Sequence, residues 1–230
     1  MRKNALVVLI VMAFNLGLWA WFNRPADPQL DFTGQVKAVS FSPYRADQDP
    51  LVNKFPTPAQ IEQDVAFLKG KVGAIRTYSS TDGMEAIPGI AEKYGVPVIA
   101  GAWLDKRLKR NEAEIAGLIK NLQEHKNITR AIVGNESILR GDFKPAQLAE
   151  YIRRVKEAAP NVQVSTAEPW HVWIHHPELV ESVDYIAIHI LPYWEFVPED
   201  KAIEWSMLPT NAWDEPVQAV CTERELKWFR

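Results

Sequence analysis

An α/β fold of the (β/α)8 TIM-barrel type, incomplete at about six β-α units, is the fold class that this sequence predicts. Apolar runs alternate with amphipathic stretches through residues 36–205, which is typical of a parallel sheet with helices between its strands. The apolar runs are nearly continuous, as expected for strands buried on both faces. The first run leads into Ser42, Pro43 and Tyr44 without the glycine cluster of an open, phosphate-binding sheet, so a barrel is favoured.

Residues 1–24 predict a membrane anchor. Residues 5–22 carry no charge, follow Arg2 and Lys3, and end among Trp19 and Trp21. This run has about the minimum length of a bilayer span, and basic residues before it predict a cytoplasmic N-terminus. We therefore expect a single-pass protein of the cytoplasmic (inner) membrane, with its domain on the periplasmic side. A cleaved signal peptide is the alternative.

Residues 25–35 contain two prolines and a glycine and predict a linker to a barrel domain over residues 36–205. The helix at residues 57–70 has clear ends, because Thr57 precedes Pro58 at its start and Gly70 closes it. The expected strands are residues 36–41, 72–78, 96–102, 131–134, 162–166 and 184–190. The expected helices are residues 57–70, 83–94, 111–124, 145–159 and 177–182, with another beginning near 198–205.

The β-α rhythm stops near residue 205. A complete barrel of this type takes about 250 residues. The chain has 230 residues, and the first 35 of them are assigned to the anchor and the linker. Residues 206–230 contain no strand-like run longer than residues 217–221, and they hold the single cysteine, Cys221. We therefore expect an atypical C-terminal tail and a reading truncated or shifted in frame before a seventh strand. An irregular natural terminus is the alternative.

Composition limits the function. A formal net charge of −3 argues against a nucleic-acid partner held through its phosphates. The lone cysteine excludes an internal disulfide and a cysteine-based zinc site. The basic cluster at residues 106–110 is expected to be a solvated loop, with contact to an anionic ligand as the alternative.

The carboxyl ends of parallel barrel strands meet on one face, where active sites are built. Residues 130–136 deliver Asn135 and Glu136 to the end of the fourth strand. There a carboxylic acid can protonate a glycosidic oxygen, while the amide holds a sugar hydroxyl. A structural Glu136, capping a helix or paired with Arg140, is the alternative.

Aromatic residues lie at or near five of the six strand ends. Their faces suit the flat C–H faces of sugar rings, although large aromatics can also simply fill a barrel end. The predicted sugar-binding residues are Tyr44, Arg76, Tyr78, Trp103, Glu168, Trp170, His189, Tyr193 and Trp194.

Residues 133–136, Val-Gly-Asn-Glu, resemble the acid/base motif of glycoside hydrolase family 17, in its bacterial β-1,3-glucanase or β-glucan transglycosylase form. Residues 76–78, 165–170 and 184–194 are similar to the second, fifth and sixth strand ends of that family. The resemblance implies that Glu136 is the acid/base and that Asn135 binds the sugar 2-hydroxyl. It also implies that His189 and Tyr193 lie near the −1 sugar, and that Glu168 contacts ligand.

The nucleophile of that family, a second Glu in a Glu-x-Gly-Trp-Pro setting, has no counterpart in this sequence. Hydrolysis with retention of the anomeric configuration needs two carboxyl groups about 5–5.5 Å apart. This chain is therefore expected to have little or no turnover.

The resemblance implies a retaining hydrolase or glucosyltransferase that is endo-1,3-β-glucanase-like, and it implies no metal or organic cofactor; residues 1–24 would anchor this enzyme in the membrane. Its ligand would be β-glucan, and glucan-synthesis machinery is a candidate partner. A non-catalytic, membrane-tethered β-glucan-binding remnant is the alternative. A metal hydrolase using His171, His175 and His189 is a weaker one, since no His-Glu-x-x-His motif is present.

Overall fold

The structure, a computed structural model, describes residues 2–24, 34, 36–197 and 227–229. Within these residues seven parallel strands form one sheet in the order β1-β2-β3-β4-β5-β6-β7. This unbroken sequential order is that of a barrel wall, because the strand order of an open doubly wound sheet reverses at its centre. The strands are β1 (Val39–Ser40), β2 (Ile75–Arg76), β3 (Val98–Ala102), β4 (Ile128–Asn135), β5 (Gln163–Pro169), β6 (Tyr185–His189) and β7 (Lys227–Phe229).

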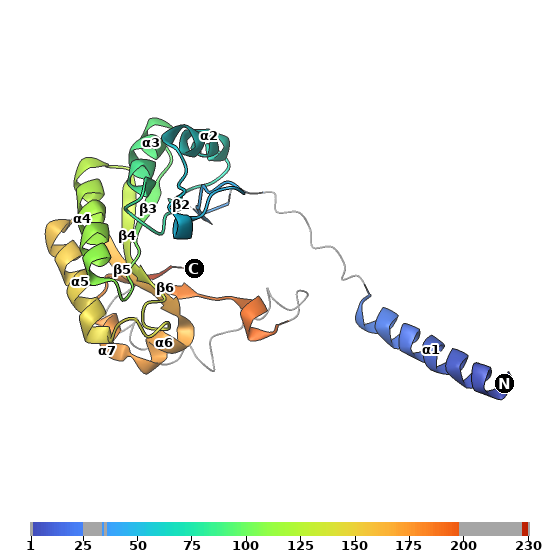
Figure 1. Ribbon diagram of the computed structural model, residues 1–230. Helices are drawn as coiled ribbons and strands as arrows, with labels where there is room; N and C mark the ends of the chain where they lie inside the picture. Colours follow the sequence, from blue (N-terminus) through green and yellow to red (C-terminus); the bar gives the residue numbers. More distant parts are fainter. Residues whose placement is uncertain (1, 25–33, 35, 198–226, 230) are drawn as a thin grey trace. The chain divides into compact units, whose positions relative to one another are not determined.

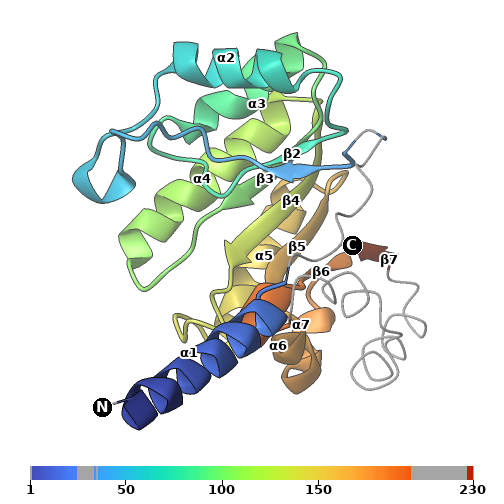
Figure 2. The same ribbon diagram turned by 90° about the vertical axis from the view of Figure 1, so that its right-hand side faces the viewer.

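Helices cover the outer face of this curled sheet (Figures 1 and 2). They are α2 (Pro58–Leu68), α3 (Ile87–Lys93), α4 (Leu108–Glu124), α5 (Pro145–Ala158), α6 (Trp170–His175) and α7 (Pro177–Val180). Three short 3-10 helices, η1 (Pro50–Val52), η2 (Met84–Ala86) and η3 (Pro192–Glu195), lie in the connections. The prediction of an incomplete (β/α)8 barrel with alternating helices is confirmed.

The amphipathic faces of α4 and α5 explain how these helices pack. Ile115 and Leu118 on α4, and Leu148, Ile152 and Val155 on α5, recur every three or four residues and are all buried. Burial of each such side chain contributes roughly 1.5–3 kcal/mol. Their common core with the apolar residues of the strands holds the carboxyl ends of the strands in place.

Helix α2 begins and ends as its sequence predicts. Thr57 Oγ1 accepts a hydrogen bond from the Gln60 N–H, and the Gln60 side chain accepts one from the Thr57 N–H, so both caps of a capping box are present. The helix predicted at residues 83–94 divides instead into η2 and α3, where Pro88 starts the second piece. Helix α6 occupies residues 170–175, which are not among the expected helices.

Strand β7 lies in the segment predicted to be an atypical C-terminal tail, outside the only strand-like run noted there, residues 217–221. Lys227–Phe229 pairs in parallel with β6, with Lys227 opposite Tyr185. A strand of three residues is too short to show an apolar period, which is why sequence patterning missed it. The predicted helix at residues 198–205 and the run at residues 217–221 lie outside the described residues. The proposed domain boundaries stay predictions.

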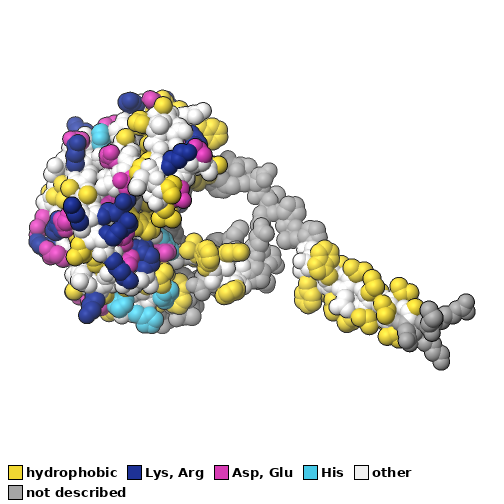
Figure 3. Space-filling view, viewed as in Figure 1, with side chains coloured by type: hydrophobic (Ala, Val, Ile, Leu, Met, Phe, Trp, Pro, Cys, Tyr) yellow, Lys and Arg dark blue, Asp and Glu magenta, His cyan; other side chains and the backbone are white. Residues whose placement is uncertain are grey.

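The chain divides into two units, one of Met1–Thr33 with Pro192–Trp205 and the other of Gly34–Leu191 with Ser206–Arg230. Helix α1 (Arg2–Phe22) belongs to the first unit. Its segment Ala5–Phe22 has a mean hydropathy of 2.2, and none of it is buried. Apolar side chains run along its segment Ala5–Phe22 (Figure 3). Helix α1 therefore has the length and composition of a membrane span or of a signal sequence.

Candidate active site

Glu136 directly follows β4 in a left-handed backbone conformation, with φ at 53°. Such a conformation costs of order 1–3 kcal/mol for a residue other than glycine and is found at functional sites. Gly134, two residues earlier, has φ at 81°, and a Cβ there would lie 2.8 Å from the Ser137 Oγ. Only glycine fits at this position. The backbone at Gly134 and Glu136 therefore differs from that of an ordinary strand end, as is common where a side chain has a functional role.

Side chains from three strands meet at Glu136. Its Oε1 lies 2.6 Å from Nδ1 of His189, the last residue of β6. The other ring nitrogen of His189 lies 3.2 Å from Nη1 of Arg76, which ends β2. Arg76 Nη2 also donates to Asn135 Oδ1 at 2.7 Å, and its guanidinium lies 4.7 Å from the ring centre of Tyr78. Five residues predicted from different strand ends thus form one connected group.

These contacts fix the tautomer of His189. A guanidinium can only donate, so His189 Nε2 accepts from Arg76. The proton of the neutral ring is then on Nδ1, which donates to Glu136. Burial lowers the pKa of His189, the hydrogen bond with Glu136 raises it, and the charge of Arg76 lowers it further. The neutral imidazole is the form that this surrounding favours.

Glu168 lies beside the turn that follows Glu136. It belongs to β5 and is fully buried. Its Oε1 accepts from the Ile138 N–H at 2.9 Å, and its Oε2 accepts from the Leu139 N–H at 3.3 Å. Burial raises the pKa of Glu168 to about 7. The Glu168 carboxyl group therefore faces the main chain of the turn after Glu136, and its contact with ligand stays a prediction.

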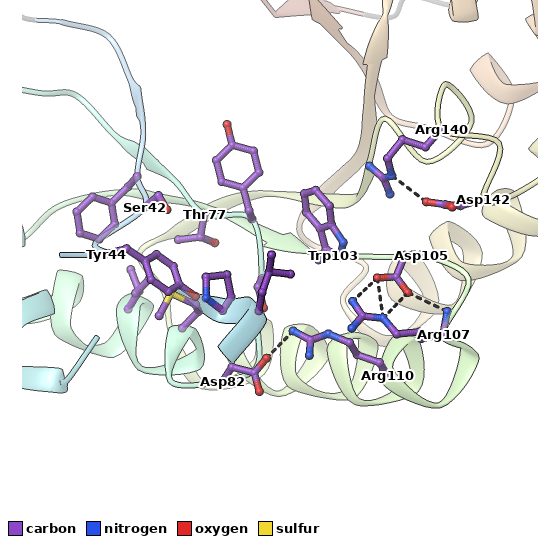
Figure 4. A pocket seen from close by; sticks show the side chains of 17 residues that line it. Ser42, Tyr44, Thr77, Asp82, Trp103, Asp105, Arg107, Arg110, Arg140 and Asp142 are labelled. Carbon is purple, nitrogen blue, oxygen red and sulfur yellow. Dashed lines mark hydrogen bonds and ion pairs between the residues drawn. The ribbon is translucent and has the colours of Figure 1, made fainter. Parts of the chain in front are cut away.

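A cavity of about 630 Å³ opens at the carboxyl ends of the first strands (Figure 4). Tyr44, Tyr78 and Trp103, all predicted to bind sugar, lie in its wall. Tyr78 also contacts Arg76, so the cavity adjoins the group around Glu136. Its other lining residues include Ser42, Thr77, Asp82, Asp105, Arg107, Arg110, Arg140 and Asp142.

The charged residues of the cavity are paired. Arg107 contacts Asp105 at 2.5 Å, Arg140 contacts Asp142 at 2.8 Å, and Arg110 contacts Asp82. Sequence reasoning missed this lining and treated residues 106–110 as a solvated loop. Arg107 is indeed largely exposed, but residues 108–110 belong to the first turn of α4, and both Arg107 and Arg110 line the cavity. Asp105 and Arg107 lie two residues apart, which was an available signal, but the partner of Arg110, Asp82, lies distant in sequence.

A second buried carboxylate fixes the cavity wall. Glu114 on α4 is fully buried and accepts hydrogen bonds from the Ser80 N–H at 2.7 Å and the Trp103 N–H at 3.3 Å. Hydroxyls of Ser79 and Thr81 each donate to it at 2.6 Å. One side chain thus ties the loop after β2 and the end of β3 to helix α4.

Residues 38–227 match the family described as the BtgE/BtgC glycoside hydrolase domain. The chain belongs to this family. A curated relative, the glucan 1,3-beta-glucosidase of Arthroderma benhamiae, is 29% identical over 167 residues, which are 70% of this chain and 52% of the relative. The probable beta-glucosidase btgE of Aspergillus terreus is 28% identical over 73% of this chain and 30% of its own length. This chain therefore spans about half or less of the curated relatives it matches.

Solved structures agree with the BtgE/BtgC assignment. The glycoside hydrolase family 17 β-1,3-glucanosyltransferase from Rhizomucor miehei is 26% identical, with a TM-score of 0.68 over 84% of this chain and 70% of that one. Its active-site mutant in complex with laminaritriose gives a TM-score of 0.69 at 25% identity. The resemblance to glycoside hydrolase family 17 is confirmed.

Three other predicted sugar-binding residues of this BtgE/BtgC domain are neither among the lining residues of the cavity nor in the connected group around Glu136. Trp170 begins α6, is half-buried, and meets His171 edge to face at 5.5 Å. Tyr193 and Trp194 lie in η3, where they are 80% and 72% exposed and meet edge to face at 5.6 Å. The segment η3 belongs to the unit of α1, and the binding of sugar by these two residues stays a prediction.

The described residues contain no group of three or more His, Cys, Asp or Glu side chains arranged to hold a metal ion. His171 and His175 lie on α6, while His189 contacts Glu136 and Arg76. The nucleophile stays unassigned. Most acidic residues that follow β6 lie in residues 198–226, outside the described part of the chain.

Proposed function

We propose that this chain binds β-1,3-glucan across the carboxyl ends of its strands and supplies the acid/base of a retaining hydrolase or glucanosyltransferase. The observation that carries the proposal is the group of Glu136, Asn135, His189 and Arg76 beside an aromatic-walled cavity of about 630 Å³. Membership of the BtgE/BtgC family supports the same reaction class.

The geometry divides the work between the two oxygens of Glu136. Because His189 donates to Oε1, Oε2 is the atom that would hold the proton transferred to the glycosidic oxygen. Asn135 is oriented in the same way. Its Oδ1 accepts from Arg76, so its two amide N–H groups are directed to other acceptors, and a sugar 2-hydroxyl is the acceptor we propose. Arg76 therefore positions Asn135 directly and Glu136 through His189.

Incubation of the full chain with laminarin and laminari-oligosaccharides, followed by product analysis, tests catalysis. Titration of tryptophan fluorescence with the same oligosaccharides tests binding. We expect Glu136→Gln to abolish any turnover and to retain binding. Glu150→Gln, an exposed change on α5, is the matched control. Most of the turnover remaining in Glu136→Gln would contradict the assignment of the acid. Unchanged glucan with a clear fluorescence response in the unaltered chain would support the non-catalytic binding protein instead.

We also propose that α1 stays attached as a single-pass anchor of the cytoplasmic membrane, with the barrel on the extracytoplasmic side. Support comes from the apolar segment Ala5–Phe22 and from the basic residues Arg2 and Lys3 before it. The intact mass of the membrane-extracted chain tests this. Loss of the first residues up to about position 22 would show a cleaved signal sequence.

Glucan-synthesis machinery is the partner that we propose for an anchored transferase of this kind. Only the family resemblance and the apolar helix support this partner. Cross-linking in intact membranes, followed by an assay for glucan-synthase activity in the purified complex, tests it. Equal synthase activity in a control purification without this chain would contradict it.

A further inference from the structure

Three consecutive residues of β5 hold the turn that carries Glu136. The Thr166 Oγ1 donates to the Gly134 carbonyl at 3.2 Å, and the Ala167 carbonyl accepts from the Glu136 N–H at 2.7 Å. Glu168 then accepts from the N–H groups of Ile138 and Leu139. The regular β4–β5 pairing shifts between Ile132 and Asn135, which is where these bonds take over.

Burying Glu168 to hold this turn is energetically unfavourable. A fully buried carboxylate is unfavourable unless hydrogen bonds compensate it, and its hydrogen bonds here go to one turn. A hydroxyl or amide side chain could cap a single N–H group. A carboxyl group has two oxygens with acceptor capacity, whether or not one of them carries a proton, so it can hold two adjacent N–H groups at once. Both charged groups that it faces, Arg140 and Glu136, belong to this turn.

We propose that Glu168 is a positioning residue for the general acid: its buried carboxylate holds the turn in the one shape that brings Glu136 onto His189. The left-handed backbone of Glu136 is unfavourable by itself, so an external restraint must retain it. Hydrogen bonds on both sides of Glu136, from Thr166 and from Glu168, are that restraint. The inference rests on the proposed function, since it takes Glu136 to be the acid.

His189 provides a readout that needs no turnover. Its pKa is raised by the hydrogen bond with Glu136, so a turn that lets Glu136 move away must lower the pKa of His189. We would label the histidine rings of the full chain with ¹³C and ¹⁵N in detergent micelles and follow the His189 signal by NMR over pH. A His189→Gln variant assigns that signal.

We expect Glu168→Gln to lower the pKa of His189, because glutamine accepts one N–H and places an amide donor against the other. Glu114→Gln is the matched control: it also alters a fully buried carboxylate that accepts main-chain N–H groups, but on α4. It should leave the His189 titration unchanged. The His125 signals, which report the contact with Glu92, show whether each variant is folded.

A double-mutant cycle separates positioning from a direct effect of the Glu168 charge. In the Glu136→Gln background, Glu168→Gln should cause no further change in the His189 titration. A folded Glu168→Gln chain with an unaltered His189 titration would overturn the proposal, and so would equal shifts in both backgrounds. If Glu168→Gln does not fold, Glu168→Asp serves in its place. Failure to act on glucan would contradict the proposed function while leaving this titration result intact.

Discussion

Arg76 is the residue that links Asn135 to His189, the hydrogen-bond partner of the proposed acid Glu136. It donates to Asn135 and to His189, and burial lowers the pKa of its own guanidinium. We predict that Arg76→Met raises the pKa of His189, because a nearby positive charge that disfavours the imidazolium is lost. NMR titration of the His189 ring measures this shift. Arg76→Lys keeps the charge and should give a smaller rise; a fall in either variant would contradict the contact geometry.

Gly134 offers a test of the strained turn. Alanine there must adopt a positive φ and also approach the Ser137 Oγ at 2.8 Å and the Leu148 Cδ1 at 3.1 Å. Gly70 also has a positive φ, but a Cβ added to it meets nothing within 4 Å. We predict that Gly134→Ala lowers the free energy of unfolding by roughly 1 kcal/mol or more beyond the loss in Gly70→Ala. Denaturant unfolding of both variants measures the difference, and equal losses would show that the turn can relax.

At the residue scale, the predicted strand ends indicated correctly which residues lie near one another, but they did not indicate where each side chain points. Asn135, Glu136, Arg76 and His189 were predicted as one site because parallel strands end on a common face. Glu168 ends a strand too, yet its side chain faces the neighbouring turn. Successive side chains of a strand point to opposite faces, and the irregular register of β4 and β5 conceals which face a given residue takes.

Helix α4 controls the aromatic wall of the cavity through Glu114. Loss of its charge would leave hydrogen-bond donors of the 79–81 loop and of Trp103 poorly satisfied. We predict that Glu114→Gln lowers the free energy of unfolding by roughly 1–3 kcal/mol and weakens the binding of laminari-oligosaccharides. Chemical denaturation and fluorescence titration measure these effects. Unaltered affinity in a destabilised Glu114→Gln chain would show that Trp103 does not contact the sugar.

At the element scale, long helices with defined caps could be predicted almost to their ends, as α2 shows. Short strands could not. The apolar runs at residues 36–41 and 72–78 contribute only Val39–Ser40 and Ile75–Arg76 to the sheet. Hydrophobic runs report burial, whereas strand bounds depend on pairing with a neighbour that is distant in sequence. The same reason accounts for the missed β7.

For the molecule as a whole, the burial of Glu168 predicts a pH-dependent stability. Its pKa rises from an ordinary value of 4.5 to about 7 in the folded chain, chiefly through burial. Between these values the folded chain holds a proton that the unfolded chain releases. The free energy of unfolding should therefore fall as pH rises through this window, by at most about 3 kcal/mol.

Denaturant unfolding of the full chain between pH 4.5 and 8 measures this dependence. Glu168→Gln should flatten the curve, while the exposed Glu150→Gln should retain the slope. A slope that persists in Glu168→Gln would assign the proton to another group.

The overall architecture was predictable because several independent signals agreed. The repeated β-α rhythm, the continuous apolar runs and the absence of a phosphate-binding turn all indicated a barrel, and the strand order confirms it. The cavity was not predictable in the same way, since its arginines and aspartates come from the connections after three different strands and, for Arg110, from the first turn of α4. Loop contacts of this kind follow from the closed fold and leave no period in the sequence.

The pairing of Arg107, Arg110 and Arg140 with Asp105, Asp82 and Asp142 leaves the cavity wall electrically neutral. An uncharged glucosyl chain entering it displaces no counterions and meets no net field, so added salt should scarcely change its affinity. A uronic-acid chain of the same length would find no unpaired cation among these residues and would lose the solvation of its carboxylates. Because the charges of the wall are matched, we expect an affinity that does not depend on salt concentration to indicate an uncharged polysaccharide ligand.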